Sequence, residues 1–134
     1  MQADQTSMQI QTLKTSDLHL DPSNARKHSP KNIQAIKASL AKFGQQKPIV
    51  VDEKGVVVAG NGTLVAAREL GWSEIACVRT HLSRAELIAY GIADNRTAEL
   101  ASWDNDELPR LMRALEEEIA HDVLRHRLVL SYRC

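Results

Sequence analysis

Short apolar runs alternate along the chain with longer stretches in which apolar residues lie three and four positions apart. The short runs at 8–13, 49–51, 56–59 and 74–79 predict strands, and 18–20 predicts a further extended piece. The helical spacing predicts helices that start at Pro30, near Gly62, after Ser83 and after Asp104–Asp106. We expect glycines to end the first two helices, and we assign no element to 121–134.

Local signals specify several of these elements in more detail. Ser29 before Pro30 is typical of a helix start, and Ser83 with Glu86 forms a capping box. The segment 52–55, which ends in glycine, predicts the turn of a β-hairpin. We expect Trp103 to pack at the start of the last helix, and the first helix to bury one apolar stripe made of Ile33, Ile36, Leu40 and Phe43.

Composition places the chain among single soluble domains. It has 134 residues, of which 43% are hydrophobic and 25% charged, and its net charge is zero, so the overall charge does not indicate a polyanion partner. The two cysteines form no metal-type pair, and no signal peptide or membrane span is visible, so we expect a cytoplasmic protein without membrane contact. Charge is uneven: residues 1–60 carry eight Lys/Arg against five Asp/Glu.

A glycine turn between a strand and a helix is the strongest candidate site. The run Val56–Gly71 passes from an apolar strand through Gly60 and Gly62 into an alanine-rich helix. The first N–H groups of a helix have no partner within it and lie at the positive end of its dipole, so this turn is suited to phosphate. The alternative is that the glycines only make the turn and that Asn61 or Thr63 only caps the helix. A phosphate site also needs a cation, and the candidates are Arg26 and Arg96.

Four segments in this order resemble the N-terminal domain of the ParB/sulfiredoxin superfamily, over about 13–117. They are DPSNAR at 21–26, FGQQKPI at 43–49, VAGNGT at 58–63 and IADNRTAE at 92–99. The resemblance implies an α/β (α+β) fold, with a small mixed sheet packed by about four helices. It also implies a site for CTP with Mg²⁺, since the corresponding regions of partition proteins bind that nucleotide.

The glycine turn departs from both branches of the superfamily. Partition proteins have Gly-Glu-Arg-Arg there, whereas this chain has Gly60-Asn61-Gly62-Thr63 and lacks both arginines. Sulfiredoxins carry a catalytic cysteine at the position of Asn61, so their repair chemistry is not expected. The run 92–99 followed by Trp103-Asp104 is most similar to the variant found with phage and bacterial DNA methyltransferases. We therefore expect a flexible N-terminus at 1–7, a ParB-like domain at 8–118 and an atypical tail at 119–134.

The leading hypothesis is a domain that binds a nucleotide or DNA phosphate at the glycine turn and serves DNA partition, modification or transcriptional control. Backbone N–H groups at Gly60 and Gly62 approach the phosphate in this interpretation. The resemblance implies the other roles: hydrogen bonds from Asn61 and Thr63, positive charge from Arg26 and Arg96, base or ribose contacts from Gln45 or Gln46, and a magnesium ion at Asn95 or Glu99.

Two other functions remain open from the sequence. The first is an enzyme, either a metal-dependent nuclease, a weak NTPase or a small-molecule kinase, with Asp94 and Glu99 as the candidate catalytic carboxylates. The second is a non-catalytic module in which the last helix forms a homodimer or docks a DNA-acting partner domain such as a methyltransferase. Catalysis is the less favoured of these predictions, since charged residues on a helix are usually only solvated.

Overall fold

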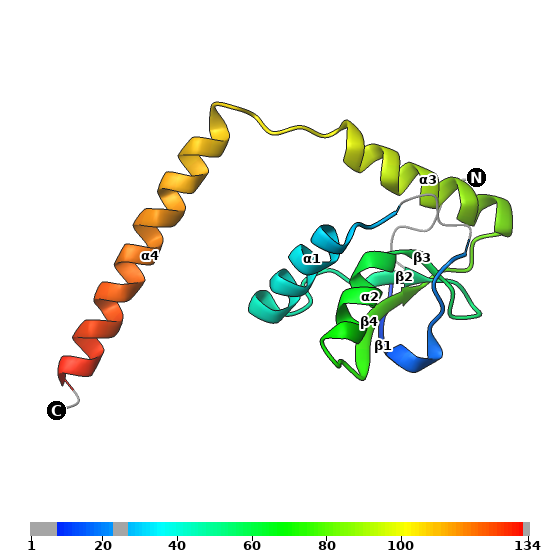
Figure 1. The fold of residues 1–134 in the computed structure, drawn as a ribbon, viewed down its shortest axis with the longest axis horizontal. Helices are drawn as coiled ribbons and strands as arrows, with labels where there is room; N and C mark the ends of the chain where they lie inside the picture. Colours follow the sequence, from blue (N-terminus) through cyan, green and yellow to red (C-terminus); the bar gives the residue numbers. More distant parts are fainter. Residues whose placement is uncertain (1–7, 23–26, 133–134) are drawn as a thin grey trace. The chain divides into compact units, whose positions relative to one another are not determined.

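A computed structural model describes residues 8–22 and 27–132 of the chain. Its contacts divide the chain into two compact units, Met1–Ala98 and Glu99–Cys134 (Figure 1). The predicted flexible N-terminus at 1–7 lies outside the described residues. The predicted boundary between 118 and 119 falls inside a continuous helix of the second unit.

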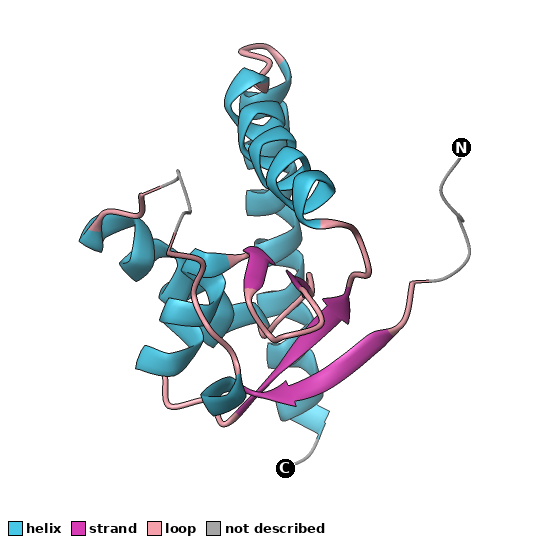
Figure 2. Cartoon of the chain, turned by 90° about the vertical axis from the view of Figure 1, so that its right-hand side faces the viewer, coloured by secondary structure: helices cyan, strands magenta, loops and turns pink. Residues whose placement is uncertain are grey.

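The first unit is built on a four-stranded mixed sheet, whose strands are magenta in Figure 2. The strand order is β1-β4-β2-β3. Its strands are β1 (Ile10–Lys14), β2 (Ile49–Val51), β3 (Val57–Ala59) and β4 (Glu74–Arg79). β4 is antiparallel to β1 and parallel to β2, whereas β2 and β3 form the predicted antiparallel hairpin. The extended piece predicted at 18–20 is reduced to an isolated bridge between His19 and Val56. The predicted α/β architecture with a small mixed sheet is confirmed.

Helix α1 (Pro30–Phe43) begins and ends where its sequence signals predict. The Ser29 hydroxyl accepts a hydrogen bond from the Asn32 N–H, and Gly44 follows the last turn. Ile33 and Leu40 are buried, but the predicted burial of Phe43 is wrong, because its side chain is 62% exposed. Phe43 is the last residue of α1, and the chain turns away at Gly44 before the ring reaches the core.

Helix α2 (Asn61–Glu69) supplies the centre of the core and ends before Gly71, as predicted. Its residues Leu64, Ala66 and Ala67 are fully buried, and the small alanines let α1 and α2 approach closely. Arg68 ties α2 to the 3₁₀ turn η1 (Thr15–Asp17), because its guanidinium donates to the Thr15 and Leu18 carbonyls. The buried core consists of Leu18, Ile33, Leu40, Ile49, Val51, Val57, Leu64, Ala66, Ala67, Ile75 and Cys77.

Cys77 lies on β4 with no exposed surface, as expected for a small core residue. Burial raises the pKa of its thiol, while the charge of Arg79 acts in the opposite direction and is the smaller influence. A thiol with a raised pKa is a poor nucleophile near neutral pH. Cys77 therefore contributes packing.

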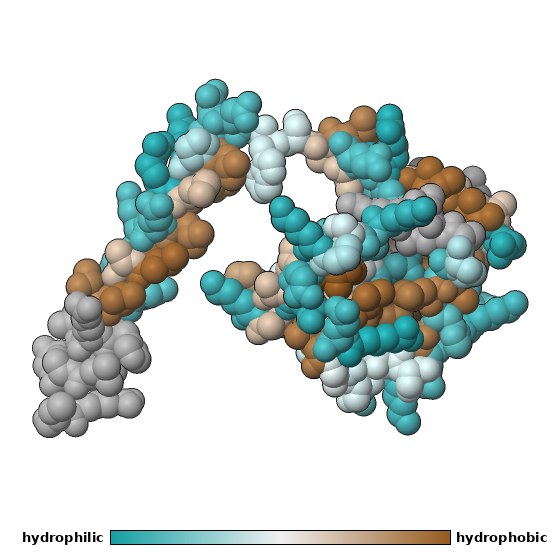
Figure 3. All heavy atoms as spheres, viewed as in Figure 1, coloured by the Kyte–Doolittle hydropathy of each residue, from teal (hydrophilic) through white to brown (hydrophobic). Residues whose placement is uncertain are grey.

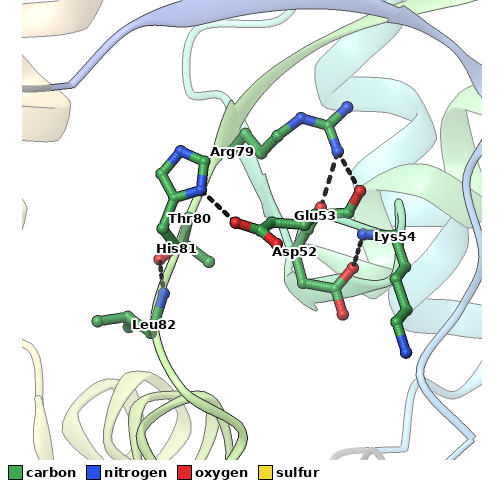
Figure 4. Close-up of polar contacts among 7 residues, drawn as sticks. All are labelled: Asp52, Glu53, Lys54, Arg79, Thr80, His81 and Leu82. Carbon is green, nitrogen blue, oxygen red and sulfur yellow. Dashed lines mark hydrogen bonds and ion pairs between the residues drawn. The ribbon is translucent and has the colours of Figure 1, made fainter.

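Polar contacts hold the turn of the β2–β3 hairpin against the end of β4 (Figure 4). The Asp52 carboxylate accepts hydrogen bonds from the Lys54 and Val56 N–H groups, which closes the turn. Arg79 donates to the carbonyls of Asp52 and Glu53 from the neighbouring strand. These contacts fix the direction in which β3 leaves the turn, and hence the position at which α2 begins.

Helix α3 (Arg84–Leu100) starts with the predicted capping box. The Ser83 N–H donates to the Glu86 carboxylate, and the Glu86 N–H donates to the Ser83 hydroxyl. The Ser83 backbone N–H, and to a smaller extent the Ser83 side chain, hydrogen-bond the Glu86 carboxylate and hold its pKa below its usual value. The α3 side chains are at most half-buried, so the box and a few contacts with β3, rather than a buried stripe, position this helix.

Helix α4 (Glu107–Tyr132) belongs to the second unit, and the Asp104 carboxylate caps it through the Asp106 and Glu107 N–H groups. The prediction that Trp103 packs at its start is wrong, since that side chain is 73% exposed. Its apolar residues Leu111, Met112, Leu115 and Ile119 recur at helical spacing on one face and are exposed. Apolar residues form a brown band along α4 (Figure 3). The helix also covers most of the segment left unassigned from the sequence. Within the described ranges, no helix has the length and apolar character needed to cross a membrane.

Gly60 makes the turn from β3 into α2. Its φ of 103° lies in the left-handed region, and a β-carbon built there would lie 2.5 Å from Ile49 Cγ2. Any other residue type would be strained by the positive φ, and its β-carbon would displace Ile49 of β2. The N-cap position of α2 is occupied by Gly60, and α2 has no side-chain cap hydrogen bond. The alternative capping roles of Asn61 and Thr63 are therefore not seen.

We predict that Gly60→Ala destabilises the chain far more than Gly71→Ala does. Both glycines have positive φ, so each substitution costs about 1–2 kcal/mol of backbone strain. A β-carbon at Gly71 meets no atom within 4 Å, whereas one at Gly60 overlaps Ile49 and adds about 1–3 kcal/mol. Urea denaturation followed by circular dichroism measures both free energies of unfolding, and equal losses would contradict this account of the turn.

Candidate functional site

A cavity of about 220 Å³ lies at the N-terminus of α2, in the first unit. Its walls come from the segment before α1, the middle of α1, the residues before and within β2, the end of β3, the glycine turn and α3. Its polar lining residues are His28, Lys47, Asn61, Thr63, Tyr90, Asp94 and Asn95. A larger hollow of about 590 Å³, between the hairpin turn and the start of α3, contains none of the predicted site residues.

Backbone N–H groups at the start of α2 are the main donors of this cavity. The Leu64 N–H makes the first bond within the helix, to the Gly60 carbonyl, so the N–H groups of Asn61, Gly62 and Thr63 have no partner inside α2. These three residues and Gly60 line the cavity. Unpaired N–H groups at the positive end of a helix dipole favour a bound anion.

The two glycines of the turn lie against different neighbours. Gly60 leaves room for Ile49, and Gly62 leaves room for His28, because a β-carbon at Gly62 would lie 2.7 Å from the His28 Cε1 atom. Their absent side chains therefore bring β2 and the His28 ring close to the turn. The predicted contact of both glycines with phosphate stays a prediction, and their backbone N–H groups are compatible with it.

Asn61 is buried and has two partners within the chain. Its Oδ1 atom accepts a hydrogen bond from the Asp21 N–H, and its Nδ2 group donates to the Val57 carbonyl. The side chain therefore joins the segment before α1 to β3. Thr63, the other predicted side-chain donor of the turn, is half-buried on the cavity wall.

Helix α3 contributes one face with Tyr90, Asp94 and Asn95 to the cavity. Tyr90 and Asp94 are four residues apart, so they neighbour each other on the helix surface. Burial of the phenol raises the pKa of Tyr90, and the negative charge of Asp94 adds to the shift. The phenol hydroxyl therefore keeps its proton and remains a hydrogen-bond donor near neutral pH.

The structure places six of the predicted site residues in the lining of this cavity. The cavity is lined by Gly60, Asn61, Gly62, Thr63, Asp94 and Asn95. Arg26 lies outside the described residues, and Glu99 belongs to the second unit. Arg96, Gln45 and Gln46 are described but are not among the lining residues.

Gln45 and Gln46 have structural partners instead. The Gln45 amide continues the β2 ladder by side-chain bonds, because its Oε1 accepts from the Ala76 N–H and its Nε2 donates to the Ala76 carbonyl. Gln46 Nε2 donates to the Phe43 carbonyl at the end of α1. Their predicted contacts with a base or ribose stay untested.

Sequence reasoning missed Lys47, His28 and Tyr90 as lining residues. Lys47 lies in the family-like segment 43–49, directly before Pro48 and the predicted strand 49–51. This position is the one sequence feature that could have indicated its place in the site. Neither the spacing nor the residue type of His28 and Tyr90 distinguishes them from surface residues. Among the described residues, no group of three or more His, Cys, Asp and Glu side chains could hold a metal ion by itself.

Comparison with known proteins identifies the family. The model of the ParB N-terminal domain matches residues 1–96, so the chain belongs to the ParB N-terminal domain family. The Escherichia coli (strain K12) ParB-like nuclease domain-containing protein YnaK is 34% identical over 55 residues. That match covers 41% of this chain and 63% of YnaK, so it spans less than two thirds of the relative.

Solved structures share the fold at low sequence identity. The chromosome-partitioning protein ParB from Caulobacter crescentus, complexed with CTP-γ-S, has a TM-score of 0.74 and 18% identity over 84% of this chain and 65% of that chain. The complex of the same ParB with the centromeric parS site has a TM-score of 0.54 and 20% sequence identity, and the match covers 63% of this chain and 46% of that chain. Sulfiredoxin from Arabidopsis thaliana has a TM-score of 0.51 and 18% sequence identity, and the match covers 63% of this chain and 97% of that chain. The predicted ParB/sulfiredoxin fold is confirmed.

We predict that Gln45→Ala destabilises the first unit while Gln46→Ala does not. Removing the Gln45 amide leaves the N–H and carbonyl of Ala76 without these partners, at a cost of about 1–3 kcal/mol. Gln46 makes one exposed bond, and its loss costs about 0.5 kcal/mol or less. Thermal and urea unfolding of both variants provides the comparison. Similar stability of the two variants would show that Gln45 is not part of the sheet in solution.

Proposed function

We propose that this chain binds a phosphate group of a nucleotide, with CTP as the first candidate, or of DNA, at the N-terminus of α2. The observation that carries the proposal is the cavity in which the N–H groups of Asn61, Gly62 and Thr63 have no partner within their helix. The binding serves DNA partition, modification or transcriptional control. Membership of the ParB N-terminal domain family supports this assignment.

The size of the cavity favours a phosphate over a whole ligand. Pockets that enclose a drug-sized molecule measure about 300–1,000 Å³, and this cavity has about 220 Å³. The described walls therefore suit the phosphate end of a nucleotide, or one phosphate of a DNA strand. A base or sugar would lie beyond these walls.

The charges of the cavity favour an anion accompanied by a cation. Lys47 supplies an ammonium group, whereas the Asp94 carboxylate on the opposite element repels a bare phosphate. Mg²⁺ is commonly held by one or two carboxylates together with substrate phosphates, so Asp94 and the predicted ligand Asn95 fit that ion without a complete protein cage. Bound there, Mg²⁺ would neutralise phosphate charge. Glu99 lies in the second unit and is not part of this proposal.

Two solved neighbours support the choice of ligands. One Caulobacter ParB structure is complexed with CTP-γ-S and another with the parS site, and both share the fold of this chain. The two arginines expected at the glycine turn are replaced here by Gly62 and Thr63. Backbone N–H groups and Lys47 therefore carry the binding, which predicts a weaker site than one with those arginines.

Calorimetric titration with CTP, GTP, ATP and ADP in magnesium buffer, with and without duplex DNA, tests the proposal. We expect CTP binding that Lys47→Gln weakens about fivefold, because one cation near the phosphate is lost. Lys42→Gln is the matched control, since Lys42 lies at the end of α1 beside Phe43 and outside the cavity. Failure of the wild-type chain to bind any of these nucleotides or DNA would refute the proposal.

A further inference from the structure

The His28 ring occupies the space that a side chain at position 62 would fill. A β-carbon on Gly62 would lie 2.7 Å from His28 Cε1, 2.9 Å from Nδ1 and 3.0 Å from Nε2. Such distances are too short for real atoms, so the imidazole lies directly against the backbone of Gly62. The N–H of that same residue is one of the three without a partner inside α2. Glycine at position 62 therefore leaves room for the His28 side chain in this turn.

The hydrogen bond of Nδ1 sets the chemistry of the other ring nitrogen. Nδ1 pairs with the Oδ1 atom of Asn32, one turn into α1. An amide oxygen can only accept, so Nδ1 carries a proton in this arrangement. In the neutral ring Nε2 then has a lone pair and repels an anion, whereas in the protonated ring Nε2 becomes a donor. The ring contacts phosphate favourably only when it is cationic.

We propose that His28 is a phosphate-binding residue of the α2 site, and that phosphate binding is coupled to the uptake of one proton by its Nε2 atom. The proton comes from solvent, and the bond that forms is Nε2–H with a phosphate oxygen as acceptor. This inference rests on the proposed function, and it adds a residue and a pH dependence to that site.

The charged or titratable residues that line the cavity with His28 are Lys47, Asp94 and Tyr90. On its own segment, Lys27 and Lys31 are its nearest cations in sequence. A phosphate bound beside the ring would add negative charge there and favour a protonated imidazole. Phosphate affinity should therefore fall as the pH rises through the range in which imidazoles lose their proton.

Proton-counting calorimetry on the full chain tests the inference. Inorganic tripolyphosphate and CTP are titrated with Mg²⁺ at about pH 6 and about pH 8, in two buffers of different ionisation enthalpy at each pH. The variants are His28→Gln, which keeps a polar side chain without the charge, and His28→Arg, which keeps a permanent charge. His19→Gln removes an exposed imidazole outside the cavity and is the control.

We expect wild type and His19→Gln to take up a proton on binding, and His28→Gln to take up less. His28→Gln should bind tripolyphosphate about tenfold more weakly than wild type at about pH 6, with little difference at about pH 8. His28→Arg should bind well at both pH values.

Three outcomes would overturn the inference while leaving the proposed function in place. They are equal affinity of wild type and His28→Gln, a loss of affinity that is the same at both pH values, and unchanged proton uptake in His28→Gln. If the wild-type chain binds neither tripolyphosphate, CTP nor DNA at either pH, the proposed function itself fails, and the inference fails with it.

Discussion

The close contact between Gly60 and Ile49 is the constraint on which the candidate site depends. Ile49 is buried and pairs with Cys77 in the parallel ladder of β2 and β4, so its position belongs to the rigid sheet. Gly60 lies against it with a left-handed backbone, and α2 begins at the next residue. The first N–H groups of α2 are therefore held in place by the packing of the core. Preorganised donors of this kind do not have to be ordered when a ligand binds.

The same turn is the basis of the proposed anion site, which lacks the arginines expected from partition proteins. The helix start provides backbone donors whatever its side chains are, and Gly62 makes room for the His28 ring. Lys47 lines the cavity from the segment before β2. In that segment the Gln45 side chain bonds to Ala76 of β4 and so fixes the course of the backbone. In the proposed site, positive charge therefore comes from neighbouring segments instead of from the turn itself. We propose that such a site binds phosphate less tightly than paired arginines would, and in a pH-dependent way.

The features that sequence reasoning predicted well are those determined by nearby residues. The cap at Ser29, the capping box of Ser83 and Glu86 and the hairpin turn depend on contacts within a few positions, and all are found. The family resemblance added the fold and the order of the segments. Predictions that needed long-range packing were less successful. Phe43 and Trp103 are exposed, Gln45 bonds to Ala76 on a distant strand, and Lys47, His28 and Tyr90 reach one cavity from three separate elements. A local sequence pattern does not indicate which distant segments come together in the fold.

Nuclear magnetic resonance of backbone amides during titration with CTP and Mg²⁺ is the most direct test of phosphate binding at the start of α2. The account predicts that the amide resonances of Asn61, Gly62 and Thr63 move most, with downfield proton shifts, because their N–H groups acquire phosphate oxygens as acceptors. Amides on the far side of the sheet, such as that of Thr12 in β1, should stay in place. Saturable binding that leaves the three α2 amides unchanged would contradict the central claim and place the ligand elsewhere on the chain.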